Sequence, residues 1–402
     1  MEGPHWGAAA REWDAVDCKT QLESMCRSPG ALREMLLFVQ TVLAADPRQP
    51  SFLFLLKYIR AAGGLRALGD GDGGAQQWRL AGGAQQMAAG LAAAVAGAGG
   101  GEVRLSHIVE SVAHSAYNSA AAQNHIECGS DEPGVYTVAG TVEGSGKPFS
   151  LTARRVVVAM PPPVWKQVAF DPQLPEDHRL LAESMVMGCV AKVLAIYPQR
   201  FWALEGEEAD SSTGGGAGGA DDEVVRDAPR RPPRRARGGA GGRRLEECGP
   251  VANLFPGDYG GRPALVGLVT GADARAFTAL PEGRQRAAVL GQYAEYFGAP
   301  EAAEPELFVV KEWMSERFSG GCFGGLTPPG LLSRAGAAAA GRAAGGVHFA
   351  GSEAAARWVG YFEGALDAGL RAALEVLAAL RPGLVGSAAT SGGDGEGPAA
   401  AL

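Results

Sequence analysis

The sequence predicts an α/β protein, on three observations. Residues 154–160 (Arg-Arg-Val-Val-Val-Ala-Met) form a nearly continuous apolar run that ends at Pro161, which is typical of a strand buried on both faces of an α/β sheet. Residues 32–42 and 52–59 place apolar side chains at helical spacing. Near the other end of the chain, a strand-like segment at 347–351 is followed by a helical pattern at about 363–380. This mixture of elements indicates the α/β class.

The remaining elements are assigned from local patterns in chain order. In the first half we expect helices within 10–64 broken at Pro47 and Pro50, a strand at 78–80, a helix at 84–95, strands at 103–105 and 108–112, and a hairpin of 136–142 and 149–152 around a Gly-Ser-Gly turn at 144–146. In the second half we expect strands at 190–197, 251–254, 264–270 and 307–310 and a helix at 284–297.

The composition narrows the class of protein. The 402-residue chain is 46% apolar, with a net charge of -8 and a pI of about 5.4. This acidic balance argues against a nucleic-acid partner.

The six cysteines include no CxxC pair, so no zinc or other metal site is expected, and their scatter favours a reducing compartment. No stretch reaches the roughly 18–20 apolar residues that span a bilayer, and the N-terminus lacks a signal-peptide pattern. We therefore expect a soluble protein, with an intracellular location favoured.

Residues 205–249 differ in kind from the rest of the chain. A Gly/Ala block at 214–220 and three acidic residues at 221–223 precede seven arginines between 230 and 244. A nucleic-acid site is the alternative interpretation of these arginines, but no aromatic residues for base stacking lie among them. We interpret the segment as a low-complexity insertion, expected to be disordered, and expect the same of the tail at 382–402.

The most informative motifs lie near the C-terminus. The first is Trp313-Met-Ser-Glu-Arg-Phe-Ser-Gly-Gly-Cys322-Phe, and the second is His348-Phe-Ala-Gly-Ser-Glu353 followed by Trp358-Val-Gly-Tyr-Phe-Glu-Gly-Ala365. The second motif predicts a strand, a short loop and a helix N-terminus. Backbone N–H groups at a helix start favour an anion or a polar ring edge, and Gly360 and Gly364 allow a flat ring or phosphate to approach the backbone.

With these motifs the chain resembles the flavin-containing amine oxidoreductases, and monoamine oxidases in particular. The resemblance runs from about residue 10 to about 378, apart from the insertion. Further matching segments follow the family's order: Glu12-Trp13-Asp14, 54–59, 82–87, 157–163, 188–192 and 201–202. The resemblance implies FAD as the cofactor.

Two residues carry the chemistry that the resemblance implies. Cys322 falls on the cysteine that monoamine oxidases bond to the flavin as a thioether; the alternative is an inert buried thiol. Lys192 falls on the lysine that approaches the flavin N5 through a water. Burial of a lysine in an apolar strand is costly without a partner. The alternative is an edge-strand lysine whose ammonium reaches solvent.

Phe323 and Tyr361 match the two aromatic residues that face each other in front of the flavin and orient the amine. The first position is usually Tyr in the family, so Phe323 keeps the stacking surface and lacks one hydroxyl. As isolated residues, both would be ordinary core aromatics.

Other residues match cofactor-contacting or substrate-lining positions. The cofactor positions are Trp313, Phe318, Gly351, Ser352, Gly360, Phe362 and, on the adenine side, Val109; Gln76 matches a polar residue of the substrate cavity.

One segment that the resemblance leads us to expect, the dinucleotide-binding strand, turn and helix, is not found in the sequence. Enzymes of this type begin with a strand, a G-x-G-x-x-G turn and a helix that bind the dinucleotide. The G-x-G-x-x-G match at 214–219 lies in low-complexity sequence. We therefore expect two interleaved domains. The FAD-binding, Rossmann-like domain would be N-terminally truncated and would use 81–181 and 316–378; a substrate domain with a mixed sheet and helices would use 1–80 and 182–315.

The implied function is oxidative deamination of a primary or secondary amine by FAD. Amine and O2 would be the small-molecule partners, and aldehyde and hydrogen peroxide the products. Within this class, polyamine and L-amino-acid oxidases are alternatives, and the cysteine motif favours the monoamine oxidases. Outside it, the alternative is an amine-oxidase-like chain that binds no flavin and serves as an interaction module.

Overall fold

The computed structural model describes residues 7–69, 74–75, 77–80, 82–115, 134–202, 224–226, 244–336 and 338–382. The chain forms two compact units, each described here by itself. The larger unit comprises Ala8–Leu105 and Val186–Gly330, and the smaller one the described parts of Ser106–Met185 and Leu331–Leu402. Both units mix helices and sheets, which confirms the α/β class.

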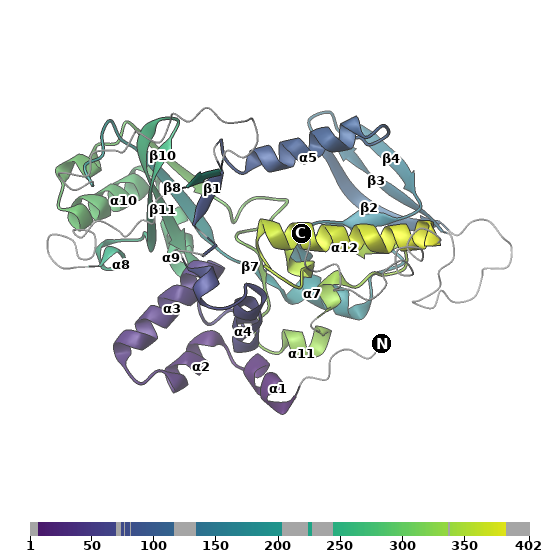
Figure 1. Cartoon of the computed structure of the whole chain (residues 1–402), viewed down its shortest axis with the longest axis horizontal. Helices are drawn as coiled ribbons and strands as arrows, with labels where there is room; N and C mark the ends of the chain where they lie inside the picture. The colour runs from purple at the N-terminus through teal and green to yellow at the C-terminus, as the bar shows by residue number, and fades with distance from the viewer. Residues whose placement is uncertain are drawn as a thin grey trace, which may run out of the picture. The chain divides into compact units, whose positions relative to one another are not determined.

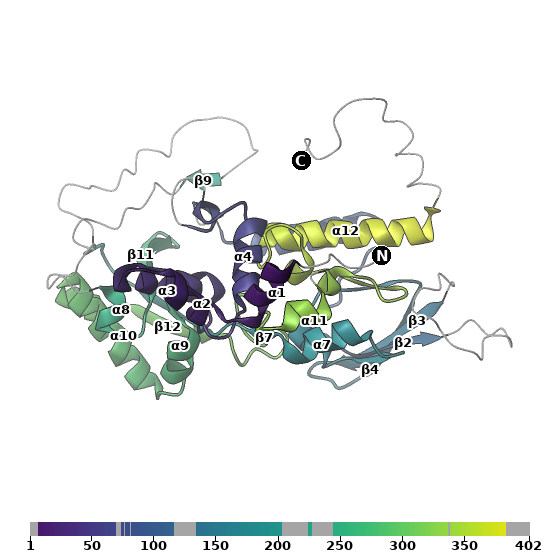
Figure 2. The same ribbon diagram turned by 90° about the horizontal axis from the view of Figure 1, so that it is seen from below.

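The larger unit begins with four helices, drawn in purple in Figure 2: α1 (Ala8–Ala15), α2 (Cys18–Met25), α3 (Pro29–Leu43) and α4 (Phe52–Ala61). Three of them start at a polar cap, because a side-chain oxygen accepts a hydrogen bond from an otherwise unpaired N–H group. Asp17 accepts from Thr20, Ser28 from Ala31 and Ser51 from Phe54. The predicted break at the two prolines is confirmed between α3 and α4.

A four-stranded antiparallel sheet is the centre of this unit (Figure 1). Its strands run in the order β10 (Asn253–Tyr259), β11 (Arg262–Thr270), β8 (Val190–Ile196) and β12 (Leu307–Glu312). One face packs on helices α9 (Gly271–Thr278) and α10 (Glu282–Phe297). Ala191, Val193 and Ala195 of β8 are fully buried on this face, against Phe277 and Tyr293 of the helices. The alternate residues of β8 point away from this core because strand side chains alternate between faces.

The unit also contains helix α5 (Gln85–Gly97). Its other elements are short: η1 (Arg66–Leu68), β1 (Trp78–Leu80), β7 (Val186–Met187), β9 (Val224–Arg226), α8 (Leu245–Cys248), η3 (Pro300–Ala303) and β13 (Gly325–Leu326). Strand β9 pairs with β1, and β13 pairs with β7, both antiparallel.

The expected insertion at 205–249 lies largely outside the described residues, as does the tail from 383. The structure differs from the prediction at the end of the insertion, where α8 is a helix. Leu245 of α8 joins the sheet core, and Arg244 forms a 2.6 Å ion pair with Glu34. These two contacts explain why the end of the insertion is ordered.

The smaller unit contains a four-stranded sheet in the order β4 (Pro148–Ala153), β3 (Val135–Val142), β2 (His107–Ser115) and β6 (Ala169–Asp171), with β6 parallel to β2. The predicted hairpin is confirmed as β3 and β4. A two-stranded parallel sheet pairs β5 (Val156–Val158) with β14 (Val347–Phe349). Its remaining elements are α6 (Pro162–Trp165), α7 (Glu176–Ser184), α11 (Leu331–Ala335), η4 (Ala339–Gly341), η5 (Ser352–Ala354) and α12 (Phe362–Leu380).

Two strand predictions need correction. Strand β5 is shorter than the expected 154–160 and is not buried on both faces, since Val157 is 47% exposed. Among the described strands, β5 pairs only with β14. A sheet of two strands is too small to bury both faces of the apolar run. Residues 103–105 form no strand; β2 begins at His107, after Ser106, whose φ is 57°.

The unit boundaries also differ from those expected from the sequence. Residues 81–105 and 316–330 belong to the larger unit, together with the residues assigned to the substrate domain. The Cys322 loop therefore packs with β8 and β7. The functions of the two units stay predictions.

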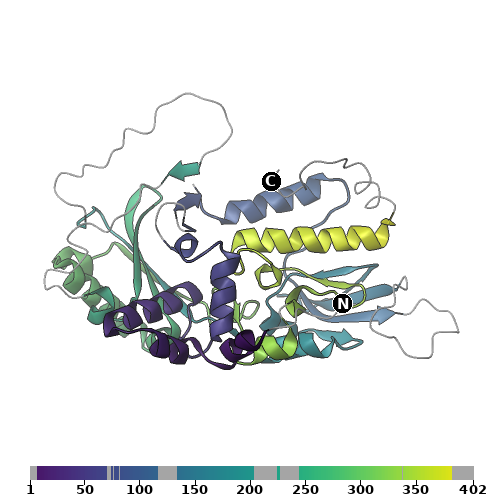
Figure 3. The same ribbon diagram turned by 60° about the horizontal axis from the view of Figure 1, so that its bottom comes forward.

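Helix α12, the long yellow helix in Figures 1 and 3, follows β14 and matches the predicted helix. A stripe of side chains along it is about half exposed: Phe362, Leu366, Leu370, Leu374 and Leu377. Within the described part of the chain, no helix combines the length and the apolar character needed to cross a membrane.

The buried amide of Gln292 gives a test of the larger unit's core. It donates to the carbonyls of Leu245 (2.7 Å) and Val251 (2.8 Å) and accepts from the N–H of Val251 (2.8 Å). We expect Gln292→Met to leave these buried groups unpaired and to lower the free energy of unfolding by about 2–4 kcal/mol.

Urea unfolding checks this prediction, with Gln285→Met on the same helix as the control. Gln285 is only partly buried, so its loss should cost less than about 1 kcal/mol. Equal costs for the two variants would show that burial of the amide is not the cause.

Candidate active site

The loop that carries Cys322 is fixed by its backbone to strand β7 and to Gly188, which connects β7 to β8. The N–H of Cys322 donates to the carbonyl of Gly188 (3.0 Å), and β13 pairs with β7 just beyond it. Gly321 has a φ of 148°, and a Cβ there would lie 2.5 Å from the carbonyl oxygen of Gly188. A glycine is therefore required for the loop to lie this close to the strand. The peptide bond between Cys322 and Phe323 is cis.

Lys192 lies near Cys322, on the face of β8 that points away from the core. The sequence suggested a buried lysine, but the structure shows it exposed. The reason is strand alternation, since its neighbours Ala191 and Val193 occupy the core face. Burial raises the pKa of the Cys322 thiol to about 11, and the nearby Lys192 ammonium opposes this rise. The structure thus brings these two predicted residues together.

Three predicted aromatic residues belong to the same segment. Trp313 follows β12, and its N–H donates to the carbonyl of Val190 (3.2 Å). Phe318 and Phe323 are 52% and 43% exposed. Large exposed aromatic faces are unusual in a core and suit the stacking of a planar ring.

The smaller unit carries the other predicted cofactor residues, between β14 and α12. Gly351 (φ 95°) ends the strand, Ser352 follows it, and Gly360 (φ 83°) precedes Tyr361 and the exposed Phe362 at the helix start. A Cβ at Gly364 would lie 2.1 Å from the carbonyl oxygen of Trp358, so the loop can fold over the first helical turn only at a glycine. This arrangement is the strand, loop and helix N-terminus that the sequence predicts, and it suits an anion.

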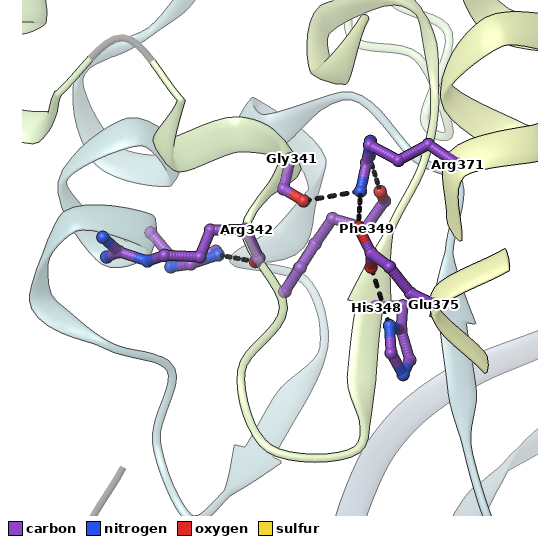
Figure 4. A network of polar contacts seen from close by, with 7 residues as sticks. Gly341, Arg342, His348, Phe349, Arg371 and Glu375 are labelled. Carbon is purple, nitrogen blue, oxygen red and sulfur yellow. Dashed lines mark hydrogen bonds and ion pairs between the residues drawn. The ribbon is translucent and has the colours of Figure 1, made fainter. Parts of the chain in front are cut away.

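A polar network that the sequence did not reveal supports this turn (Figure 4). Arg371 of α12 donates to the carbonyls of Phe349 (2.6 Å) and Gly341 (2.8 Å) and to Glu375 (2.6 Å). Glu375 also contacts Nδ1 of the buried His348 at 2.9 Å. The spacing of Arg371 and Glu375, four residues apart on a helix, was the available signal for their pairing. Arg371 thereby fixes a carbonyl two residues before Gly351.

The structure does not describe every predicted residue. Gln76 lies outside the described residues. Val109 is half-buried on β2, beside a register shift between Val109 and Ser111 in the pairing with β3. Cys322, Lys192 and the three aromatics lie in the larger unit; Val109, Gly351, Ser352, Gly360, Tyr361 and Phe362 lie in the smaller one.

These residues fit a flavin. The larger unit offers a partly exposed thiol beside an ammonium group and exposed aromatic faces, and the smaller unit offers a glycine-bounded turn at a helix N-terminus. Each unit by itself offers one kind of contact that a flavin dinucleotide uses: aromatic faces in the larger unit, and a helix N-terminus that favours an anion in the smaller one.

Comparison with known proteins agrees with this geometry. Residues 22–377 match the model of the flavin containing amine oxidoreductase family. The chain is 30% identical to a probable flavin-containing monoamine oxidase A of Dictyostelium discoideum over 379 residues, which is 93% of this chain and 69% of that protein. It is 27% identical to the flavin-containing amine oxidase A of Equus caballus over 391 residues, or 94% of this chain and 60% of that protein.

Among solved structures, cyclohexylamine oxidase from Brevibacterium oxydans IH-35A has a similar fold. The TM-score is 0.70 at 26% identity, covering 93% of this chain and 70% of the other.

The chain belongs to the flavin-containing amine oxidoreductase family. The predictions of an amine oxidase class and of FAD as its cofactor are confirmed at this level. The chain spans between 60% and 69% of the length of the two curated relatives described above.

The proximity of Lys192 to Cys322 can be tested in the flavin-free protein. Lys192→Met removes the charge that opposes the raised pKa of the thiol, so the pKa should rise further. Less thiolate, the reactive form, is then present at pH 8.5. We expect Cys322 to react with iodoacetamide roughly two- to fivefold more slowly, as measured by mass spectrometry of its peptide.

Lys19→Met on α2 is the control, since Lys19 pairs with Glu23 on its own helix. The reaction rate of Cys322 in this variant should match that of the wild type. An unchanged or faster rate in Lys192→Met would contradict the proximity.

Proposed function

We propose that this chain contributes the substrate-side residues and the flavin anchor of an amine oxidase that deaminates a primary or secondary amine with O2. The observation that carries this proposal is the Cys322 loop, where a thiol, the ammonium of Lys192 and exposed aromatic faces meet on one unit. The family match supports the same reaction class.

Each residue has a proposed role. Bound flavin supplies a two-electron acceptor for the α-carbon hydrogen of the amine. Cys322 would hold the ring through a thioether, and Trp313 and Phe318 would contact it. Lys192 would hold a water and its protons beside the ring. Gly351, Ser352, Gly360 and Phe362 would contact the cofactor at the helix start, and Val109 its adenine side.

Phe323 and Tyr361 would orient the amine in front of the ring. Their aromatic faces favour a neutral amine and exclude water from its α-carbon. Because Phe323 lacks the hydroxyl that the family usually has here, the difference should appear in turnover and substrate preference. Gln76 is proposed to line the substrate cavity.

The monoamine class is our proposed substrate class. Its support is the cysteine motif and the name of the Dictyostelium relative, a probable flavin-containing monoamine oxidase A. The alternative classes are tested directly by comparing turnover of a monoamine, a diamine and an L-amino acid.

The colour of the purified protein tests the anchor. We expect a yellow protein whose flavin stays with the polypeptide after acid precipitation. Cys322→Ala should still bind flavin, but the colour should move to the supernatant because the thioether is absent. The visible absorbance of oxidised flavin, compared between pellet and supernatant, measures this.

Cys26→Ala is the matched control, because Cys26 is a partly buried thiol at the end of α2. Its flavin should remain attached. Flavin that stays bound to Cys322→Ala after precipitation would assign the anchor to another residue. Colourless wild-type protein that FAD cannot reconstitute would instead favour the non-catalytic alternative.

A further inference from the structure

Two lysines lie opposite each other on the open face of the central sheet. Strands β8 and β12 pair so that Lys192 is the register partner of Lys311. Directly opposed residues of an antiparallel pair point to the same face, with Cβ atoms about 5 Å apart. Both lysines are exposed. Like charges at such positions repel each other, so the sheet needs a way to separate the two ammonium groups.

Glu316 is the counter-ion of one of the two lysines. Its carboxylate forms an ion pair with the ammonium of Lys311, which lies 5.3 Å from the centre of the Trp313 ring. The backbone holds Glu316 in place, because its N–H donates to the carbonyl of Trp313 (3.3 Å) and its carbonyl accepts from Ser319 (3.2 Å) and Gly320 (2.7 Å). The turn that leads to the Cys322 loop therefore carries the counter-ion of Lys311.

The neighbouring carboxylate does not compete for this role. Glu312 accepts hydrogen bonds from the N–H groups of Met314 and Ser315 and from the Ser315 hydroxyl. Its oxygens are engaged within their own turn. On its other side, Lys192 has Leu268 of β11 as its register partner, which brings no charge.

We propose that Glu316 is a positioning residue: it holds Lys311 over Trp313, so that of these two lysines it is Lys192 whose charge faces Cys322 and the cofactor. This role rests on the proposed function where it concerns the cofactor. The charge balance at Cys322 is a property of the chain's own residues, and it is measurable without flavin.

Three variants separate charge from structure: Glu316→Gln, Lys311→Met and the double variant Lys311→Met/Glu316→Gln. The first readout is the alkylation rate of Cys322 by iodoacetamide in flavin-free protein at pH 8.5, measured on its peptide. In Glu316→Gln, Lys311 becomes an unpaired positive charge beside Lys192. Extra positive charge favours the thiolate, so the rate should rise roughly two- to threefold.

The other two variants should move the rate in distinguishable ways. Lys311→Met leaves Glu316 as an unpaired negative charge, and the rate should fall roughly twofold. The double variant restores the net charge, and the rate should return close to that of the wild type. A merely structural role predicts a different order: each variant would loosen the loop, expose the thiol and speed alkylation, most of all in the double variant. That order would overturn the proposal.

A second readout applies to the flavin-loaded protein, through the rate at which an amine reduces the flavin. Glu316→Gln should slow it, and the double variant should recover part of the loss. An equal or larger loss in the double variant would overturn the role at the cofactor. If the wild type binds no flavin, the proposed function fails, while the alkylation series still decides the charge balance. The Lys19 and Glu23 pair on α2, neutralised in the same way, is the control and should change neither rate.

Discussion

The candidate site depends on the close contact between the Cys322 loop and Gly188, the residue that follows strand β7 and leads into β8. The Cys322 N–H donates to the Gly188 carbonyl, and Gly321 lies against Gly188 and Met187 without room for a side chain. Strand β8 in turn is central in its sheet and buried against α9 and α10. Because Gly188 lies two residues before β8, which carries Lys192, the thiol and the ammonium are placed by the same sheet. A site built in this way needs little further ordering when a ligand binds.

In the smaller unit, side chains rather than backbone contacts hold the candidate cofactor turn in place. Its turn between β14 and α12 has two glycines with positive φ and follows the end of a two-stranded sheet. Arg371 connects the helix to β14 through the carbonyl of Phe349 and to the turn at 339–341 through the carbonyl of Gly341, and Glu375 connects the helix to His348. The guanidinium thus orders backbone that strand pairing alone would leave less constrained. Charge-assisted hydrogen bonds of this kind are stronger than neutral ones.

Much of this architecture could be predicted because its signals are local. The hairpin of β3 and β4, helix α12 and the break before α4 follow from turn residues, apolar periodicity and prolines. The motif around Cys322 likewise identified the loop. The exposure of Lys192 could not be read from a mostly apolar strand, because it depends on which face the partner strands and helices cover. The same holds for Val157, and for Arg244, whose partner Glu34 is 210 residues away.

Because Lys311 lies on the outer strand β12, it also affects whether two molecules can pair edge to edge. β12 is the outer strand of the four-stranded sheet, and among the described strands it pairs only with β8. Its exposed residues Leu307 and Val309 would make a favourable template for a strand from another molecule. A lysine next to them on the same face opposes such pairing, because a second copy would bring its own positive charge alongside. The residue that must be kept apart from Lys192 therefore also protects the protein from edge-to-edge aggregation.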